Sequence, residues 1–197
     1  GAWFLRNYAP VRDGVGFHFA QYDRKIFGPV IRGCIKGLKV SDKGHYTVYL
    51  PAYEDEKLVN FLRQFKQIRW QIFSKHCTGS YTTKKISVQP INNAAFVKSM
   101  AGSRGVLCGA GFETPAEALF LGKKLMVVPM KNQYEQHLNA AALKSMGVPV
   151  FRKLNNKSIE KISNWLDEGT IPQVDFGESA IPAVNQVMKI YHNLTDC

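Results

Sequence analysis

A glycine-rich segment followed by hydroxyl and carboxyl groups has the residue types of an anion-binding turn. Residues 108–117 read CGAGFETPAE and lie between a short apolar run and an amphipathic one. Glycines let the backbone turn sharply and approach a ligand closely, and the free N–H groups that open the next helix attract anions. We therefore expect a diphosphate to bind at this turn.

The same segment also fits a purely structural interpretation. Thr114 as N-cap, Pro115 at the first helical position and Glu117 three residues after the cap would form a capping box. A Gly-x-Gly element by itself is common in structural turns. Both interpretations therefore stay open, and Glu113 faces either solvent or the ligand.

A second polar segment, residues 129–140, reads PMKNQYEQHLNA. Glu135 and Asn139 are four positions apart, and Gln136 and Asn139 are three apart, so a helix places all three on one face. Carboxylate and amide groups suit a polyhydroxylated ligand, because each sugar hydroxyl both donates and accepts hydrogen bonds. The alternative is an ordinary polar helix start.

The elements that must position these segments alternate between strand and helix from residue 45 onward. The pattern predicts an α/β fold: a Rossmann-like parallel sheet of about six strands with helices on both faces, which binds ligands at its carboxyl edge. The expected strands are 46–50, 69–73, 86–91, 106–108, 125–128 and 148–151. The expected helices are 55–65, 93–100, 114–121, 134–146, 158–166 and 183–194, and residues 77–85 form a polar loop.

The first 44 residues do not follow this alternation. We interpret residues 1–44 as an interdomain connection or the remnant of an N-terminal domain, and residues 45–178 as the sheet domain. We expect residues 179–197 to form a C-terminal helix that packs back toward a missing N-terminal domain. A first residue of Gly, with no initiating Met, agrees with a piece of a longer protein.

The basic charge is concentrated at the front of the chain. Residues 1–85 hold 15 Lys and Arg against 6 Asp and Glu, and the rest holds 11 against 9. A surplus of this kind favours anionic partners, namely nucleotide phosphates, an acidic membrane surface or nucleic acid, and its alternative is an ordinary solvated face. Apolar runs are too short to cross a membrane, and the four widely spaced cysteines predict reduced thiols in the cytoplasm. Those cysteines are Cys34, Cys77, Cys108 and Cys197.

The two polar segments together resemble the C-terminal, donor-binding half of glycosyltransferases built from two Rossmann domains, the GT-B type. The peptidoglycan N-acetylglucosaminyl transferase and the antibiotic and plant glucosyltransferases have this pattern. The matching residues, in order, are Gly111, Thr114, Glu117, Ala118, Gly122, Pro129, Glu135, Gln136, Asn139 and Ala140.

This resemblance implies a hexosyltransferase that binds a nucleotide sugar, with a uridine diphosphate sugar as the expected donor. The general base would come from the chain's own N-terminal acceptor domain, so residues 1–197 alone would be inactive. No metal and no tightly bound cofactor is expected. The implied contacts are Ala110, Gly111, Phe112 and Thr114 for the diphosphate, Glu117 for the ribose, Glu135, Gln136 and Asn139 for the sugar, and backbone groups of Ile91 and Asn92 for the base.

Two positions depart from the family pattern. Residues 52–56 are AYEDE, where peptidoglycan relatives have a glycine-rich loop with serine, and acidic side chains there would repel phosphate. Gly109 and Ala110 stand where many relatives carry His or Ser. Both departures remove an expected contact to the diphosphate.

Two other functions remain alternatives. A sugar-nucleotide 2-epimerase has the same two-domain plan but would carry a different set of carboxylates and histidines. A non-enzymatic nucleic-acid-binding module would use the basic front segment and its aromatic residues, although no nucleic acid is expected by the preferred hypothesis. Those aromatic residues are Trp3, Phe4, Tyr8, Phe17, Phe19 and Tyr22.

Overall fold

The computed structural model describes residues 13–20 and 22–195, and for 193–195 the backbone alone. Trp3, Phe4, Tyr8 and Cys197 lie outside the described residues. The chain divides into two compact units, one of residues 31–175 and one that joins residues 1–30 to 176–197. Each unit is described by itself.

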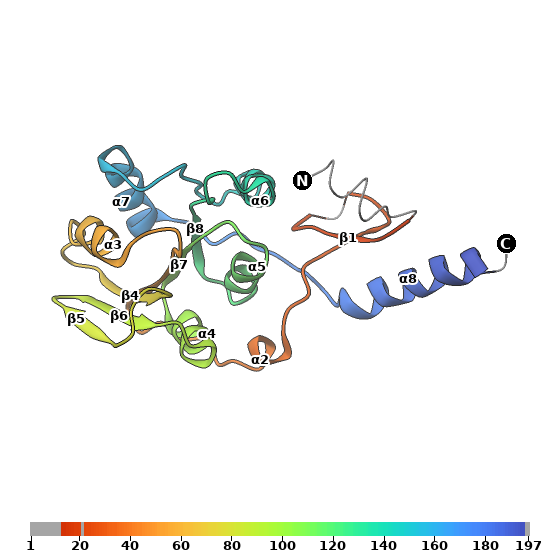
Figure 1. The fold of residues 1–197 in the computed structure, drawn as a ribbon, viewed down its shortest axis with the longest axis horizontal. Helices are drawn as coiled ribbons and strands as arrows, with labels where there is room; N and C mark the ends of the chain where they lie inside the picture. Colours follow the sequence, from red (N-terminus) through yellow and green to blue (C-terminus); the bar gives the residue numbers. More distant parts are fainter. Residues whose placement is uncertain (1–12, 21, 196–197) are drawn as a thin grey trace. The chain divides into compact units, whose positions relative to one another are not determined.

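The larger unit is built on a six-stranded sheet with the order β5-β6-β4-β3-β7-β8 (Figure 1). Five strands run parallel, and β5 is antiparallel to β6. This arrangement confirms the predicted Rossmann-like fold. The strands are β3 His45–Tyr49, β4 Arg69–Ser74, β5 Tyr81–Thr83, β6 Ile86–Pro90, β7 Gly105–Cys108 and β8 Lys124–Val127.

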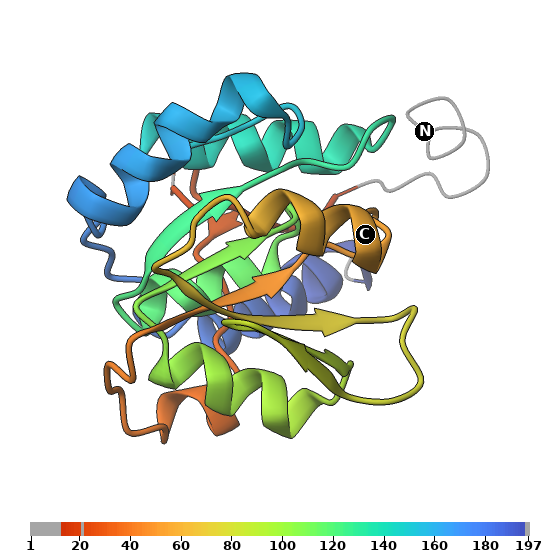
Figure 2. The same cartoon turned by 90° about the vertical axis from the view of Figure 1, so that its left-hand side faces the viewer.

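Helices cover both faces of the sheet, and the central strands are therefore buried on both sides. Figure 2 shows α3 (Asp55–Leu62) and α7 (Ile159–Glu168) on one side and α4 (Asn93–Gly102) on the other. On the α3 and α7 side, alternate strand residues such as Val48 and Ile72 form the main core. On the α4 side, the Phe96 ring packs edge-on against Phe73. The remaining helices of this unit are α2 Gly33–Lys36, α5 Glu113–Phe120, α6 Tyr134–Ser145 and the 3-10 turn η1 Asn156–Ser158.

Two sequence predictions for this unit were wrong in detail. The expected loop at 77–85 contains β5, and Lys84 makes the turn into β6 with a left-handed φ of 54°. The expected strand at 148–151 is reduced to one bridge between Val127 and Val150. Pro149 explains the reduction, because proline has no N–H to donate to a ladder.

The segment before the sheet belongs in part to the same unit. Residues 31–44, interpreted above as connection, lie within the larger unit, where Ser41 N–H and Lys43 N–H donate to the Ala101 and Gly102 carbonyls at the end of α4. In the smaller unit, β1 (Gly16–Phe17) pairs in parallel with β2 (Ile26–Phe27), and α8 spans Ala180–Thr195.

Candidate functional site

The glycine-rich turn lies at the carboxyl end of β7 and leaves one side open. The Gly109 N–H donates to the Tyr49 carbonyl at 3.2 Å, which continues the sheet pairing for one residue. Ala110 is buried, and its carbonyl accepts from Asn139 Nδ2 at 3.2 Å. A Cβ atom added at Gly111 would meet no atom within 4 Å beyond its chain neighbours. A ligand can therefore approach the backbone at Gly111 closely.

Helix α5 begins directly after this turn, one residue earlier than predicted. Its N-cap is Phe112, whose side chain makes no capping hydrogen bond. The structural alternative, a capping box of Thr114 and Glu117, is therefore not formed. The first-turn N–H groups of a helix have no partner within the helix, and at an uncapped N-terminus they can bind an anion.

Glu117 is occupied by a different partner, Arg32. The Arg32 guanidinium donates from Nε to Oε1 at 2.6 Å and from the second terminal nitrogen to Oε2 at 2.8 Å. The Glu117 side chain is 1% exposed, whereas that of Arg32 is 35% exposed. The hydrogen bond that Arg32 donates to Glu117 raises the pKa of Arg32, with further contributions from the charges of Glu117 and Glu113. This charged fork is a stronger partner for the carboxylate than the helix cap that the sequence suggested.

Arg32 lies between the first turns of two helices. Its Nε is also 3.0 Å from the exposed Glu113 carboxylate, and its first terminal nitrogen donates to Asn93 Oδ1 at 3.2 Å. Asn93 opens α4 and Glu113 opens α5. Sequence reasoning missed Arg32, because it stands 85 positions before Glu117 in a segment that was interpreted as a connection. No local pattern around Arg32 marks it.

The second segment folds as α6 and the loop before it, and its side chains lie on one face as predicted. Asn139 Nδ2 lies 3.5 Å from Glu135 Oε1. Gln136 accepts from the Met130 N–H at 2.9 Å and donates to Gln133 at 3.2 Å. Gln136 and Asn139 are buried, and their hydrogen bonds hold the loop at Met130 and the turn at Ala110 in place. Glu135 is exposed.

The backbone groups assigned to the base are partly engaged. The Ile91 N–H donates to the Ser74 carbonyl at 2.9 Å, and the Asn92 carbonyl accepts from Phe96 N–H at 2.8 Å within α4. The Asn92 side chain caps α4 by accepting from Ala95 N–H. A base at this position would use the other backbone groups of Ile91 and Asn92.

A cavity of about 550 Å³ opens at the carboxyl ends of β3, β7 and β8. Among the described residues, its lining carries basic side chains and no acidic one. The acidic residues of the 52–56 segment do not line it: Glu54 pairs with Lys57 at 2.8 Å, and Asp55 accepts from Ser74. The repulsion expected from that segment is therefore reduced. The lining residues are Leu50, Pro51, Ala52, Tyr53, Gly109, Val128, Pro129, Met130, Lys131, Asn132, His137, Arg152 and Lys153.

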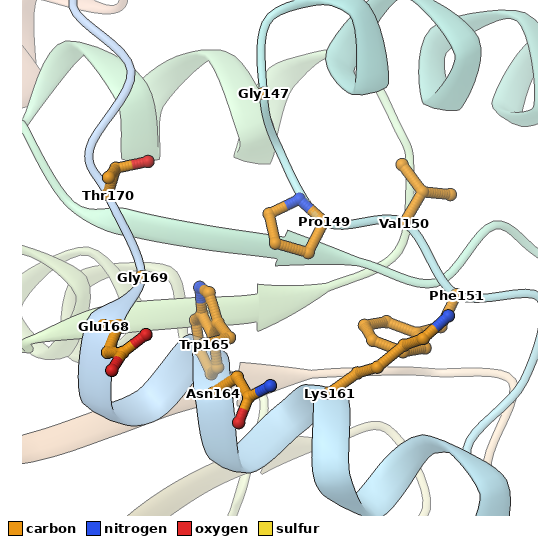
Figure 3. A pocket seen from close by; sticks show the side chains of 10 residues that line it. All are labelled: Gly147, Pro149, Val150, Phe151, Lys161, Asn164, Trp165, Glu168, Gly169 and Thr170. Atoms are coloured by element: carbon orange, nitrogen blue, oxygen red, sulfur yellow. The ribbon is translucent and has the colours of Figure 1, made fainter.

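A second hollow, of about 430 Å³, lies between residues 147–151 and α7 (Figure 3). Trp165 lines it, and among the described residues the buried Trp165 Nε1 has no hydrogen-bond partner. This hollow contains no residue of either polar segment. We therefore do not assign it to the site.

Metal and membrane features are absent from the part of the chain that the structure describes. No three His, Cys, Asp or Glu side chains there gather as a metal site. Within the same described residues, no helix combines the length and apolarity needed to cross a bilayer.

Several solved structures with the same fold are glycosyltransferases, of which this chain covers about half or less. The spinosyn forosaminyltransferase SpnP matches with a TM-score of 0.58 and 12% identity over 87% of this chain and 52% of its own. The glycotransferase of kitacinnamycin matches with a TM-score of 0.55 and 16% identity over 85% of this chain and 51% of its own. UGT2 of Phytolacca americana, complexed with UDP-2-fluoro-glucose and pterostilbene, matches with a TM-score of 0.53 and 16% identity over 73% of this chain and 38% of its own.

These matches show that the fold is one half of a GT-B glycosyltransferase, and the chain spans about half the length of the first two. No curated protein matches the chain by sequence. Residues 16–169 match the family described as glycosyl transferase family 1. The chain therefore belongs to glycosyl transferase family 1.

Proposed function

We propose that this chain binds a nucleoside diphosphate sugar, expected to be a uridine diphosphate sugar, and presents it for transfer to an acceptor hydroxyl. One observation carries the proposal: the open turn at Gly111 leads into α5, whose N-cap residue Phe112 supplies no capping side chain, at the carboxyl end of an interior parallel strand. Helix N-termini at this edge of a Rossmann-like sheet bind diphosphates through backbone N–H groups.

The remaining contacts follow from positions around this turn. Backbone groups of Ala110, Gly111 and Phe112, with the Thr114 hydroxyl, would bind the diphosphate, and Glu117 would accept from the ribose hydroxyls. The basic lining of the 550 Å³ cavity supports an anionic ligand at the same edge. For the sugar, the exposed Glu135 is the most accessible of the three predicted ligands, since Gln136 and Asn139 already hold loops.

Transfer would be a direct displacement at the anomeric carbon of the hexose. The acceptor oxygen forms a bond to the anomeric carbon while the bond between that carbon and the diphosphate oxygen breaks. The configuration at the anomeric carbon inverts. The first turn of α5 stabilises the charge that develops on the leaving diphosphate. The base that takes the acceptor proton would come from an N-terminal acceptor domain, so we expect no transfer by residues 1–197 alone.

A thermal-shift screen against a panel of nucleoside diphosphates and their sugars tests the proposal. A ligand at a hundred times its Kd stabilises the folded state by about 2.7 kcal/mol, so a donor should raise the Tm clearly. We expect the largest rise from uridine diphosphate and its sugars, and none from uridine at equal concentration. If no nucleotide in the panel raises the Tm at millimolar concentration, the proposal is wrong.

A further inference from the structure

The carboxylate assigned to the ribose is closed off by Arg32. Both Glu117 oxygens already accept hydrogen bonds from the guanidinium, at 2.6 and 2.8 Å. The Glu117 side chain is 1% exposed and Arg32 is the more exposed partner at 35%. A pair of ribose hydroxyls cannot reach this carboxylate while Arg32 keeps its present position.

Arg32 already contacts a second carboxylate, that of Glu113. Glu113 Oε1 lies 3.0 Å from the Arg32 Nε, and the Glu113 side chain is 63% exposed. Asn93 Oδ1 accepts a third hydrogen bond from the same guanidinium. If Arg32 releases Glu117, these two groups keep the guanidinium paired at the rim of the site.

We propose that Arg32 exchanges between two carboxylates: with no donor bound it holds Glu117 with two nitrogens and touches Glu113 with Nε alone, and it turns its two-pronged pairing to Glu113 when ribose hydroxyls replace it on Glu117. This inference rests on the proposed function, because it assumes that a ribonucleotide binds at this edge. The exchange explains why a buried carboxylate and an exposed one face the same arginine. It also makes the residue 31–36 segment, which carries Arg32 and α2, sensitive to donor binding.

Ribose binding is weakened by the free energy needed to break the Arg32–Glu117 pair. It is strengthened by the free energy that Arg32 gains by pairing with Glu113. The appropriate readout is therefore the hydroxyl preference, defined as the affinity for uridine diphosphate divided by that for its 2′,3′-dideoxy analogue. Calorimetry measures both affinities on the same protein. The dideoxy analogue keeps the diphosphate and the base, so other contacts cancel in the ratio.

Glu113→Gln should lower the hydroxyl preference by about two- to fivefold, the scale of one exposed ion pair, with little change in Tm. Arg32→Lys keeps the positive charge but loses the two-pronged geometry, so Glu117 is released more easily and the preference should rise. Glu160→Gln removes an exposed glutamate of α7, on the opposite face of the sheet, and should leave the preference unchanged.

Two results would overturn the exchange while leaving nucleotide binding intact. One is an unchanged preference in Glu113→Gln. The other is a lower preference in Arg32→Lys, which would mean that Arg32 supports Glu117 in the bound state. Absence of any uridine diphosphate binding by the unaltered chain would instead overturn the proposed function, and the exchange with it.

Discussion

The two polar segments at the carboxyl edge are held in place by different kinds of interaction. In the first, Glu117 depends on a charged fork from Arg32, 85 positions earlier in the chain. In the second, Gln136 depends on neutral hydrogen bonds to Met130 and Gln133, within six residues. The first segment is thus coupled to a distant part of the chain, whereas much of the second is held locally.

The largest difference between the segments should appear in stability when Arg32 is replaced. Arg32→Met leaves the buried Glu117 carboxylate without its partner, and breaking a buried pair costs about 3–5 kcal/mol. Because Arg32 is partly exposed, we expect a loss of about 2–4 kcal/mol in the free energy of unfolding. Chemical denaturation measures this loss.

Arg104→Met is the matched control for that experiment. Arg104 pairs with Asp42 at 3.0 Å, but both side chains are more than half exposed. An exposed pair contributes about 0–1 kcal/mol, so this variant should remain close to the unaltered chain. Equal losses in the two variants would mean that the Arg32 pair is no more than a surface ion pair.

The glycine in strand β7 and the glycine in the following turn should differ in how much stability they lose on replacement by alanine. A Cβ at Gly105 would lie 2.8 Å from the Lys124 carbonyl oxygen, and we expect Gly105→Ala to cost about 1–3 kcal/mol in unfolding free energy. A Cβ at Gly111 meets nothing, so Gly111→Ala should keep its stability within about 0.5 kcal/mol.

The affinity for the nucleotide provides a second test at Gly111. The added methyl at Gly111 would hinder the close approach of a diphosphate to the backbone, so affinity for uridine diphosphate should fall. Unchanged calorimetric affinity in a stable Gly111→Ala variant would place the diphosphate elsewhere.

The second segment should affect only the sugar end of the donor. Replacing both Glu135 and Gln136 with Ala should lower the affinity for the nucleotide sugar by about tenfold and leave free uridine diphosphate nearly unaffected. Lys144→Ala, an exposed position of the same helix, controls for changes in α6. Equal losses for both ligands would assign these residues to the phosphates or to the loop scaffold.

The sequence predicted what depends on short-range patterns. The alternation of strands and helices was sufficient to predict the parallel sheet. The spacing of Glu135 and Asn139 correctly predicted that they lie close together on α6. The glycine-rich turn was correctly placed between β7 and α5.

The features that the sequence did not predict depend on tertiary contacts or on marginal local signals. The partner of Glu117 became visible only when the fold brought Arg32 to α5, and the local alternative, a capping box, satisfied every sequence rule for a helix start. Strand β5 is three residues long and forms through pairing with β6, so its segment resembles a loop. At residues 148–151, one proline converts a strand pattern into a single bridge.

Calorimetric titration of the unaltered chain and of Glu117→Gln with uridine diphosphate tests the central claim most directly. We expect saturable binding by the unaltered chain, weakened in Glu117→Gln by about 1–3 kcal/mol, the contribution of hydrogen bonds to a charged group. No heat from the unaltered chain at millimolar ligand would contradict donor binding at this edge. Normal binding by a destabilised Glu117→Gln variant would show that Glu117 serves only to pair with Arg32.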